Sequence, residues 1–135
     1  MFKKIHVFRV KPDQEVITAI AGYCSSHAIN SAVLMGMIGS VKTARINFLK
    51  ELPGKYESVD YSGPLEIVTA QGTIALKDKE RIVHIHMQLS AKKAAVGGHL
   101  VLATVFSTAE VVLGELDYQL NRGLDSYTGL NELES

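Results

Sequence analysis

Three histidines are the residues of this sequence best suited to chemistry. His84 and His86 are separated by one residue, and His99 follows thirteen residues after His86. Residues two apart on a β-strand share one face and lie ~6.6 Å apart along the chain, so both imidazoles can reach one ion. Three neutral imidazoles hold a divalent metal with one position open, as in catalytic zinc sites, and the same donors suit nickel, copper or iron. We interpret His84, His86 and His99 as a candidate metal site.

The segment around the first two histidines predicts the strand that would position them. Within residues 81–90, one face carries the apolar side chains and the other carries His84, His86 and Gln88. The apolar side chains are those of Val83, Ile85, Met87 and Leu89. This period of two is typical of a half-buried strand. Gly97-Gly98 is expected to allow a tight turn that brings His99 alongside the pair. The alternative, a polar sheet face without an ion, stays open at this point.

The rest of the chain predicts an α+β fold, a largely antiparallel sheet with one amphipathic helix packed on it. Residues 4–10 alternate as a strand should, with His6, Phe8 and Val10 on one face. Apolar residues then recur at helical spacing over about 13–28, with Asp13 and Glu15 at the N-terminal end. The later β-rich segments are separated by short Gly, Pro or charged interruptions: Ala32–Ile38, Lys42–Lys50, Leu65–Leu76, Arg81–Ser90 and Thr108–Tyr118. We expect the polar tail, 120–135, to lie on the surface.

Three charged residues lie in apolar surroundings and are further candidates for a site: Arg9, Glu66 and Glu110. An unpaired buried charge is costly, so such residues usually form an ion pair, face solvent or lie at a subunit contact. Glu66 or Arg9 could also serve as a polar partner of the histidines, and Glu66 as a general base. The sequence has no Gly-x-Ser-x-Gly motif, so nucleophilic catalysis has no support.

Composition limits the other classes of function. Lys+Arg and Asp+Glu number 14 each, so the cationic excess expected of a nucleic-acid-binding protein is absent. Cys24 is the only cysteine, which excludes an internal disulfide and fits a reducing compartment. The longest apolar run, Ala32–Ile38, is far below the ~20 residues of a membrane span. We expect one domain over 1–135, located in the cytoplasm.

The chain resembles the PPC (plants and prokaryotes conserved) domain family nearly end to end. The most specific motifs are His84-Ile85-His86 and Val96-Gly97-Gly98-His99-Leu100. Further matching motifs are Met35-Gly36-Met37-Ile38-Gly39-Ser40, Gly63-Pro64-Leu65-Glu66-Ile67-Val68, Gly72-Thr73-Ile74 and Ala109-Glu110-Val111-Val112. Two turns depart from the pattern: Asp13 replaces a common glycine, and Lys92-Lys93-Ala94-Ala95 lacks a common Asp-Gly.

The resemblance implies a homotrimer in which the three matching histidines bind zinc. In plant relatives the domain accompanies AT-hooks, Arg-Gly-Arg-Pro elements that bind DNA, and mediates assembly. This chain has no Arg-Gly-Arg-Pro. The leading hypothesis is therefore a homotrimeric metal-binding domain of undefined activity. Two alternatives remain: a DNA-associated regulatory or interaction module, and a metal-dependent enzyme acting on a small substrate.

Overall fold

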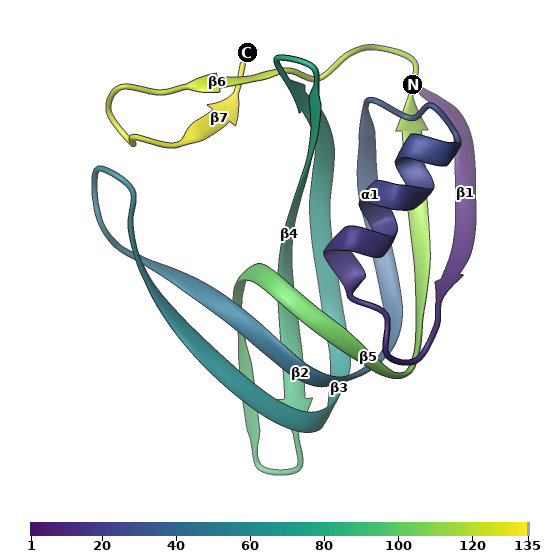
Figure 1. Cartoon of the computed structure of the whole chain (residues 1–135), viewed down its shortest axis with the longest axis vertical. Helices are drawn as coiled ribbons and strands as arrows, with labels where there is room; N and C mark the ends of the chain where they lie inside the picture. Colours follow the sequence, from purple (N-terminus) through teal and green to yellow (C-terminus); the bar gives the residue numbers. More distant parts are fainter. Residues whose placement is uncertain (135) are drawn as a thin grey trace.

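Strands dominate the computed structural model, which describes residues 1–134. The elements in chain order are β1 (Phe2–Val10), α1 (Val16–Ser26), β2 (Ala32–Glu51), β3 (Lys55–Lys77), β4 (Glu80–Ala91), β5 (Ala94–Leu116), β6 (Arg122–Leu124) and β7 (Asn131–Leu133). Figure 1 shows α1 lying beside β1 and the C-terminal part of β5, and a small hairpin of β6 and β7 at the C-terminus.

The main sheet closes on itself through β5. Its strand order is β1-β5-β2-β3-β4, and β5 pairs in addition with β4. The first residues of β5 pair with β4, and the later residues pair with β2 and β1. Each of these pairings is antiparallel. The predicted antiparallel sheet with one helix is therefore confirmed, and its closure places the β4–β5 hairpin beside the end of β2.

Three strands are longer than the sequence pattern indicated. Ala32–Ile38 and Lys42–Lys50, predicted as separate segments, belong to the single strand β2. Gly39 joins them at a register shift, where a Cβ would lie 1.8 Å from the carbonyl oxygen of Thr108. The glycine thus permits close approach to β5 and bends the strand without ending it. Likewise, β3 and β5 begin well before Leu65 and Thr108.

The helix is shorter than the predicted span of 13–28. Asp13 has φ 70° and Ala28 has φ 54°, both left-handed conformations that a helix does not continue through. Glu15 is the N-cap, and its carboxylate accepts hydrogen bonds from the backbone N–H groups of Ile17 and Thr18, each at 2.9 Å. Glycine adopts the left-handed backbone found at Asp13 without strain, which fits the glycine that the resemblance leads one to expect at this turn.

The core lies between the helix and the inner face of the sheet. Val16, Ile20 and Cys24, spaced four residues apart on α1, are fully buried. On β1 the predicted alternation is confirmed, because His6 and Val10 are buried whereas Val7 is 70% exposed. The outer face of β1 therefore carries apolar residues that no other part of residues 1–134 covers.

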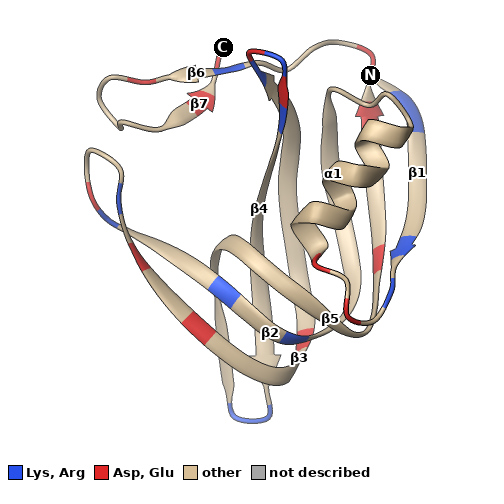
Figure 2. Ribbon diagram, viewed as in Figure 1, with Lys and Arg blue, Asp and Glu red and all other residues tan. Residues whose placement is uncertain are grey.

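Charged residues of both signs are dispersed over the molecule. Figure 2 shows acidic and basic residues together at the turn between β3 and β4, with a basic tip at the β4–β5 hairpin. Within residues 1–134, no helix is long and apolar enough to cross a membrane.

Candidate metal centre

β4 presents two histidines on one face, as its alternation predicts. Ile85, Met87 and Leu89 are at most 2% exposed and point into the core. His84 and His86 lie on the opposite face of the strand, with His84 partly buried and His86 exposed. Core packing of the apolar face thus fixes the side from which both imidazoles project.

The hairpin between β4 and β5 brings the third histidine to the pair. His99 lies directly opposite His86 in the strand register. The turn falls at Lys92-Lys93, so the prediction that Gly97-Gly98 forms it is wrong. Both glycines lie within β5, where neighbouring strands crowd them: a Cβ on Gly97 would lie 2.6 Å from the carbonyl oxygen of Met87. They are required for close packing of β5 between its neighbours.

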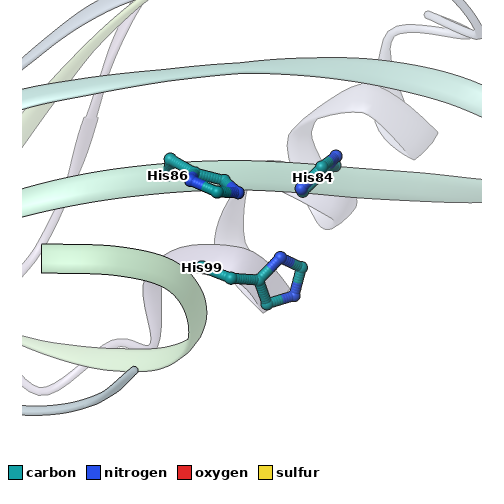
Figure 3. A group of neighbouring side chains, drawn as sticks. All are labelled: His84, His86 and His99. Carbon is teal, nitrogen blue, oxygen red and sulfur yellow. The ribbon is translucent and has the colours of Figure 1, made fainter. Parts of the chain in front are cut away.

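The three imidazoles face one another across this hairpin (Figure 3). The ring centroids of His84 and His99 are 4.9 Å apart, those of His84 and His86 5.2 Å, and those of His86 and His99 5.6 Å. One ring nitrogen from each lies within 4.8 Å of the other two. Within residues 1–134, no carboxylate or carbonyl oxygen is hydrogen-bonded to any of the three rings.

This donor set fits a divalent metal ion. Tetrahedral zinc–nitrogen bonds of about 2.0–2.1 Å place two ligand nitrogens ~3.4 Å apart, so the three nitrogens must approach one another by up to about 1.4 Å to bind one ion. Burial lowers the pKa of His84 to about 4, and the neighbouring His99 and Arg122 act in the same direction. Burial likewise lowers the pKa of His99. Both imidazoles are therefore neutral at pH 7, the state that binds metals.

The C-terminal hairpin adds a residue that the sequence did not point to. The tail was expected to lie on the surface, but Arg122 of β6 is buried, with 7% of its surface exposed. Its Nη2 donates to Thr73 Oγ1 at 2.9 Å and lies 3.2 Å from Nδ1 of His84, while its Nη1 donates to the carbonyl oxygen of Asn131 at 3.0 Å. No motif near Arg122 signals this role, because contacts 38 and 49 residues away in sequence create it.

A cavity adjoins the histidines and Arg122. It has a volume of about 470 Å³, and its lining includes Thr73, His84, His86, Arg122 and Glu132. A smaller cavity of about 210 Å³, lined in part by Tyr56, His99 and Arg122, lies beside it. The arrangement therefore offers three imidazoles that could hold an ion, one fixed cation and room for a small molecule.

Glu66 does not belong to this arrangement. It is exposed on β3 and lies opposite Ser90, whereas Gln71 and Thr73 are the β3 residues opposite His86 and His84. The five residue steps from Glu66 to Gln71 correspond to ~16 Å along the strand. Because the register sets that separation, Glu66 is not a nearby polar partner or base for the histidines.

Arg9 and Glu110 are also placed elsewhere. They lie opposite each other in the pairing of β1 with β5, and both are exposed. The guanidinium of Arg9 donates hydrogen bonds to Thr108 Oγ1 at 2.9 Å and to the Ser107 carbonyl oxygen at 3.1 Å. Both partners belong to β5, so the Arg9 side chain packs along that strand. Arg9 and Glu110 both belong to the outer face of the sheet.

The family follows from a match over most of the chain. Residues 1–117 match the sequence profile of the Plants and Prokaryotes Conserved (PCC) domain. This chain belongs to the PCC domain family. It is the family, abbreviated PPC above, that the histidine motifs resemble. Among curated proteins, no PCC relative or other sequence matches this chain significantly.

Solved structures share the fold of this chain over almost all of their length. A metal-containing protein from Archaeoglobus fulgidus is 27% identical, with a TM-score of 0.91 over 100% of this chain and 96% of its own. A plant- and prokaryote-conserved protein from Pyrococcus horikoshii is also 27% identical, with a TM-score of 0.91 over 100% and 94%. A "putative dna binding protein" from Bacteroides thetaiotaomicron is 20% identical, with a TM-score of 0.90 over 99% and 96%, and shows the fold alone.

Proposed function

We propose that this PCC protein binds one divalent metal ion, zinc, through His84, His86 and His99. The observation that carries the proposal is the convergence of three ring nitrogens within 4.8 Å of one another. The metal-containing relative from Archaeoglobus fulgidus supports it. Bound there, zinc would supply a Lewis acid beside the cavity.

Metal analysis of protein purified without a histidine tag tests this proposal. We expect about one equivalent of metal per chain in the wild type and a loss of most of it in the double variant His84→Ala/His86→Ala. His27→Ala is the matched control, because His27 is exposed at the end of α1 and bonds to the Tyr23 carbonyl oxygen. Equal metal in the wild type and the double variant would reject the site.

We further propose that copies of this chain assemble, as the homotrimer that the resemblance implies, through the outer face of the sheet. Val7, Ile38 and Val68 are 70%, 71% and 57% exposed. Arg9, two residues after Val7, lies opposite Glu110, which lies opposite Ile38. Val68 follows Ile67, which lies opposite Gly39, the neighbour of Ile38. Exposed apolar residues on a sheet face that also carries Arg9 and Glu110 are typical of a protein–protein contact.

Light scattering after size exclusion tests the assembly. The wild type should have the mass of three chains, and Ile38→Glu should shift it toward the monomer by placing a charge in the contact. Tyr127→Glu is the control, because Tyr127 is 79% exposed on the tail, away from this face. A monomeric wild type contradicts the proposal.

A metal-dependent enzyme acting on a small substrate is the second candidate, and the cavity of about 470 Å³ beside the histidines favours it. With Glu66 distant, the polar groups available there are Thr73, Arg122 and Glu132. Direct DNA contact has less support, because charges of both signs are interspersed and balance over the sequence.

A further inference from the structure

Arg122 is a buried cation whose partners among residues 1–134 do not balance its charge. Its Nη atoms bond to a hydroxyl, a carbonyl oxygen and an imidazole, and its buried Nε has no hydrogen-bond partner. No carboxylate of residues 1–134 lies within 4 Å of its guanidinium. Burying an arginine in this way is costly unless a further group pairs with it.

The contact between Arg122 and His84 is incompatible with a metal-bound His84. A neutral imidazole has one N–H and one lone pair. If Nδ1 binds the ion, its lone pair is used, and if Nε2 binds it, Nδ1 carries the proton. In either case Nδ1 no longer accepts a hydrogen bond from Nη2 of Arg122, 3.2 Å away. Metal binding therefore releases a guanidinium N–H beside the ion.

With a metal ion bound to the three histidines, the positive charges of the site favour binding of an anion. Three neutral imidazoles leave the two positive charges of the ion uncompensated, and Arg122 adds a third close by. Glu132 lines the same cavity and acts on Arg122 through its charge, but it lies beyond ion-pair distance. A cavity of about 470 Å³ is large enough for a small molecule between these groups.

We propose that this cavity binds a small carboxylate anion, held by Arg122 beside the ion of the histidine triad. Nε and Nη2 lie along one edge of the guanidinium, and Nε is covered in the metal-free arrangement. A carboxylate that replaces His84 as the partner of Nη2 would also bond to Nε once the guanidinium moves away from His84 and uncovers that edge. This paired geometry is the one that arginine and carboxylates prefer. The inference rests on the proposed metal site and specifies the class of small molecule that binds beside it.

Acetate titration of the cobalt(II)-loaded full-length protein tests the inference. Calorimetry and the visible spectrum of cobalt report binding independently of any activity, and metal content is measured first. We expect acetate to bind the wild type and to change the cobalt spectrum. In Arg122→Gln the acetate affinity should fall about tenfold or more at equal metal content, because a charged hydrogen-bond donor is lost. The acetate affinity of Arg122→Lys should lie between those of the wild type and Arg122→Gln. Arg122→Lys replaces Arg122→Gln in the comparison if the glutamine variant does not fold. Lys92→Gln, a change in the exposed hairpin turn, should leave the affinity unchanged.

The possible outcomes separate the two proposals. A wild type without metal overturns both the metal site and the anion site. A metal-loaded wild type that binds acetate no better than the Arg122 variants overturns the anion site alone. Binding of inorganic phosphate in place of acetate overturns the carboxylate assignment. Glu132→Gln should strengthen acetate binding, and a loss of metal in that variant would instead make Glu132 the chain's own anion and overturn the inference.

Discussion

His99 lies directly across from His86 in the antiparallel pairing of β4 with β5. This relationship makes the candidate site a property of one hairpin, because His84 precedes His86 by two residues on the same strand face. A metal ion held there would tie the first part of β5 to β4. Changes that move β5 should therefore affect metal binding even where they do not touch an imidazole.

Gly98→Ala should lower both stability and metal affinity. Gly98 has φ 156°, and a Cβ there would lie 2.9 Å from Cγ2 of Ile46 and 3.2 Å from the carbonyl oxygen of Asn47. We expect a loss of roughly 1–3 kcal/mol in the free energy of unfolding, measured in denaturant, from strain at one backbone position. Gly22→Ala is the control: its Cβ would meet nothing within 4 Å, and alanine in a helix should stabilise by about 1 kcal/mol. Equal effects of the two substitutions would contradict this account.

Glu115→Gln should destabilise the protein in a pH-dependent way. Nε2 of His6 donates to Oε2 of Glu115 at 2.9 Å, and Lys3 lies 3.4 Å from Oε1. The hydrogen bond from His6, then that from Lys3, lowers the pKa of Glu115. Because the pKa of Glu115 is lower in the folded state, its ionised form stabilises the fold at pH values above its ordinary pKa near 4.5. This stabilisation is lost as the pH falls through the lowered pKa.

The free energy of unfolding of the wild type should therefore exceed that of Glu115→Gln by about 1–3 kcal/mol at pH 7, and this difference should shrink below pH 4. Urea unfolding at pH 7 and at pH 3 measures it. Glu80→Gln, an exposed change at the start of β4, provides the reference. A penalty that is the same at both pH values would exclude the charged form of Glu115 as its cause.

Cys24 should be inert in the folded protein. It is fully buried on α1, and burial raises the pKa of its thiol to about 11. Since the thiolate is the reactive form, a disulfide reagent at pH 8 should label native protein at the rate of unfolding and label denatured protein at once. Rapid stoichiometric labelling of the native protein would show that α1 leaves the sheet readily.

Zinc should stabilise the wild type against heat. Ligand bound only by the folded state, at a free concentration a hundred times its Kd, adds about 2.7 kcal/mol to the free energy of unfolding. We expect a rise in Tm on adding zinc, its reversal by a chelator, and no rise in His84→Ala/His86→Ala. A similar rise in that double variant would place zinc at another site.

The local part of the site could be predicted from the sequence, because strand alternation at His84 and His86 is a property of neighbouring residues. The position of His99 also followed, although through a hairpin turn at Lys92-Lys93 in place of the glycine pair. Arg122 could not be predicted, since its place depends on a tail that folds back across β3 and β4. The same holds for Glu66, whose distance from the histidines is set by the register of β3 against β4.

The length of β2 was missed for a related reason. Glycines in a strand pattern indicate either a turn or a bulge, and the distinction at Gly39 depends on β5, about seventy residues later in the chain. Local periodicity thus fixed which residues share a face, whereas strand length and partner choice depend on contacts distant in sequence.

Anomalous diffraction from crystals grown with zinc tests the central claim most directly. Data collected above and below the zinc absorption edge should give one strong peak per chain among His84, His86 and His99, with zinc–nitrogen distances of about 2.0–2.1 Å. No peak at that point, or zinc bound only elsewhere, would contradict the account.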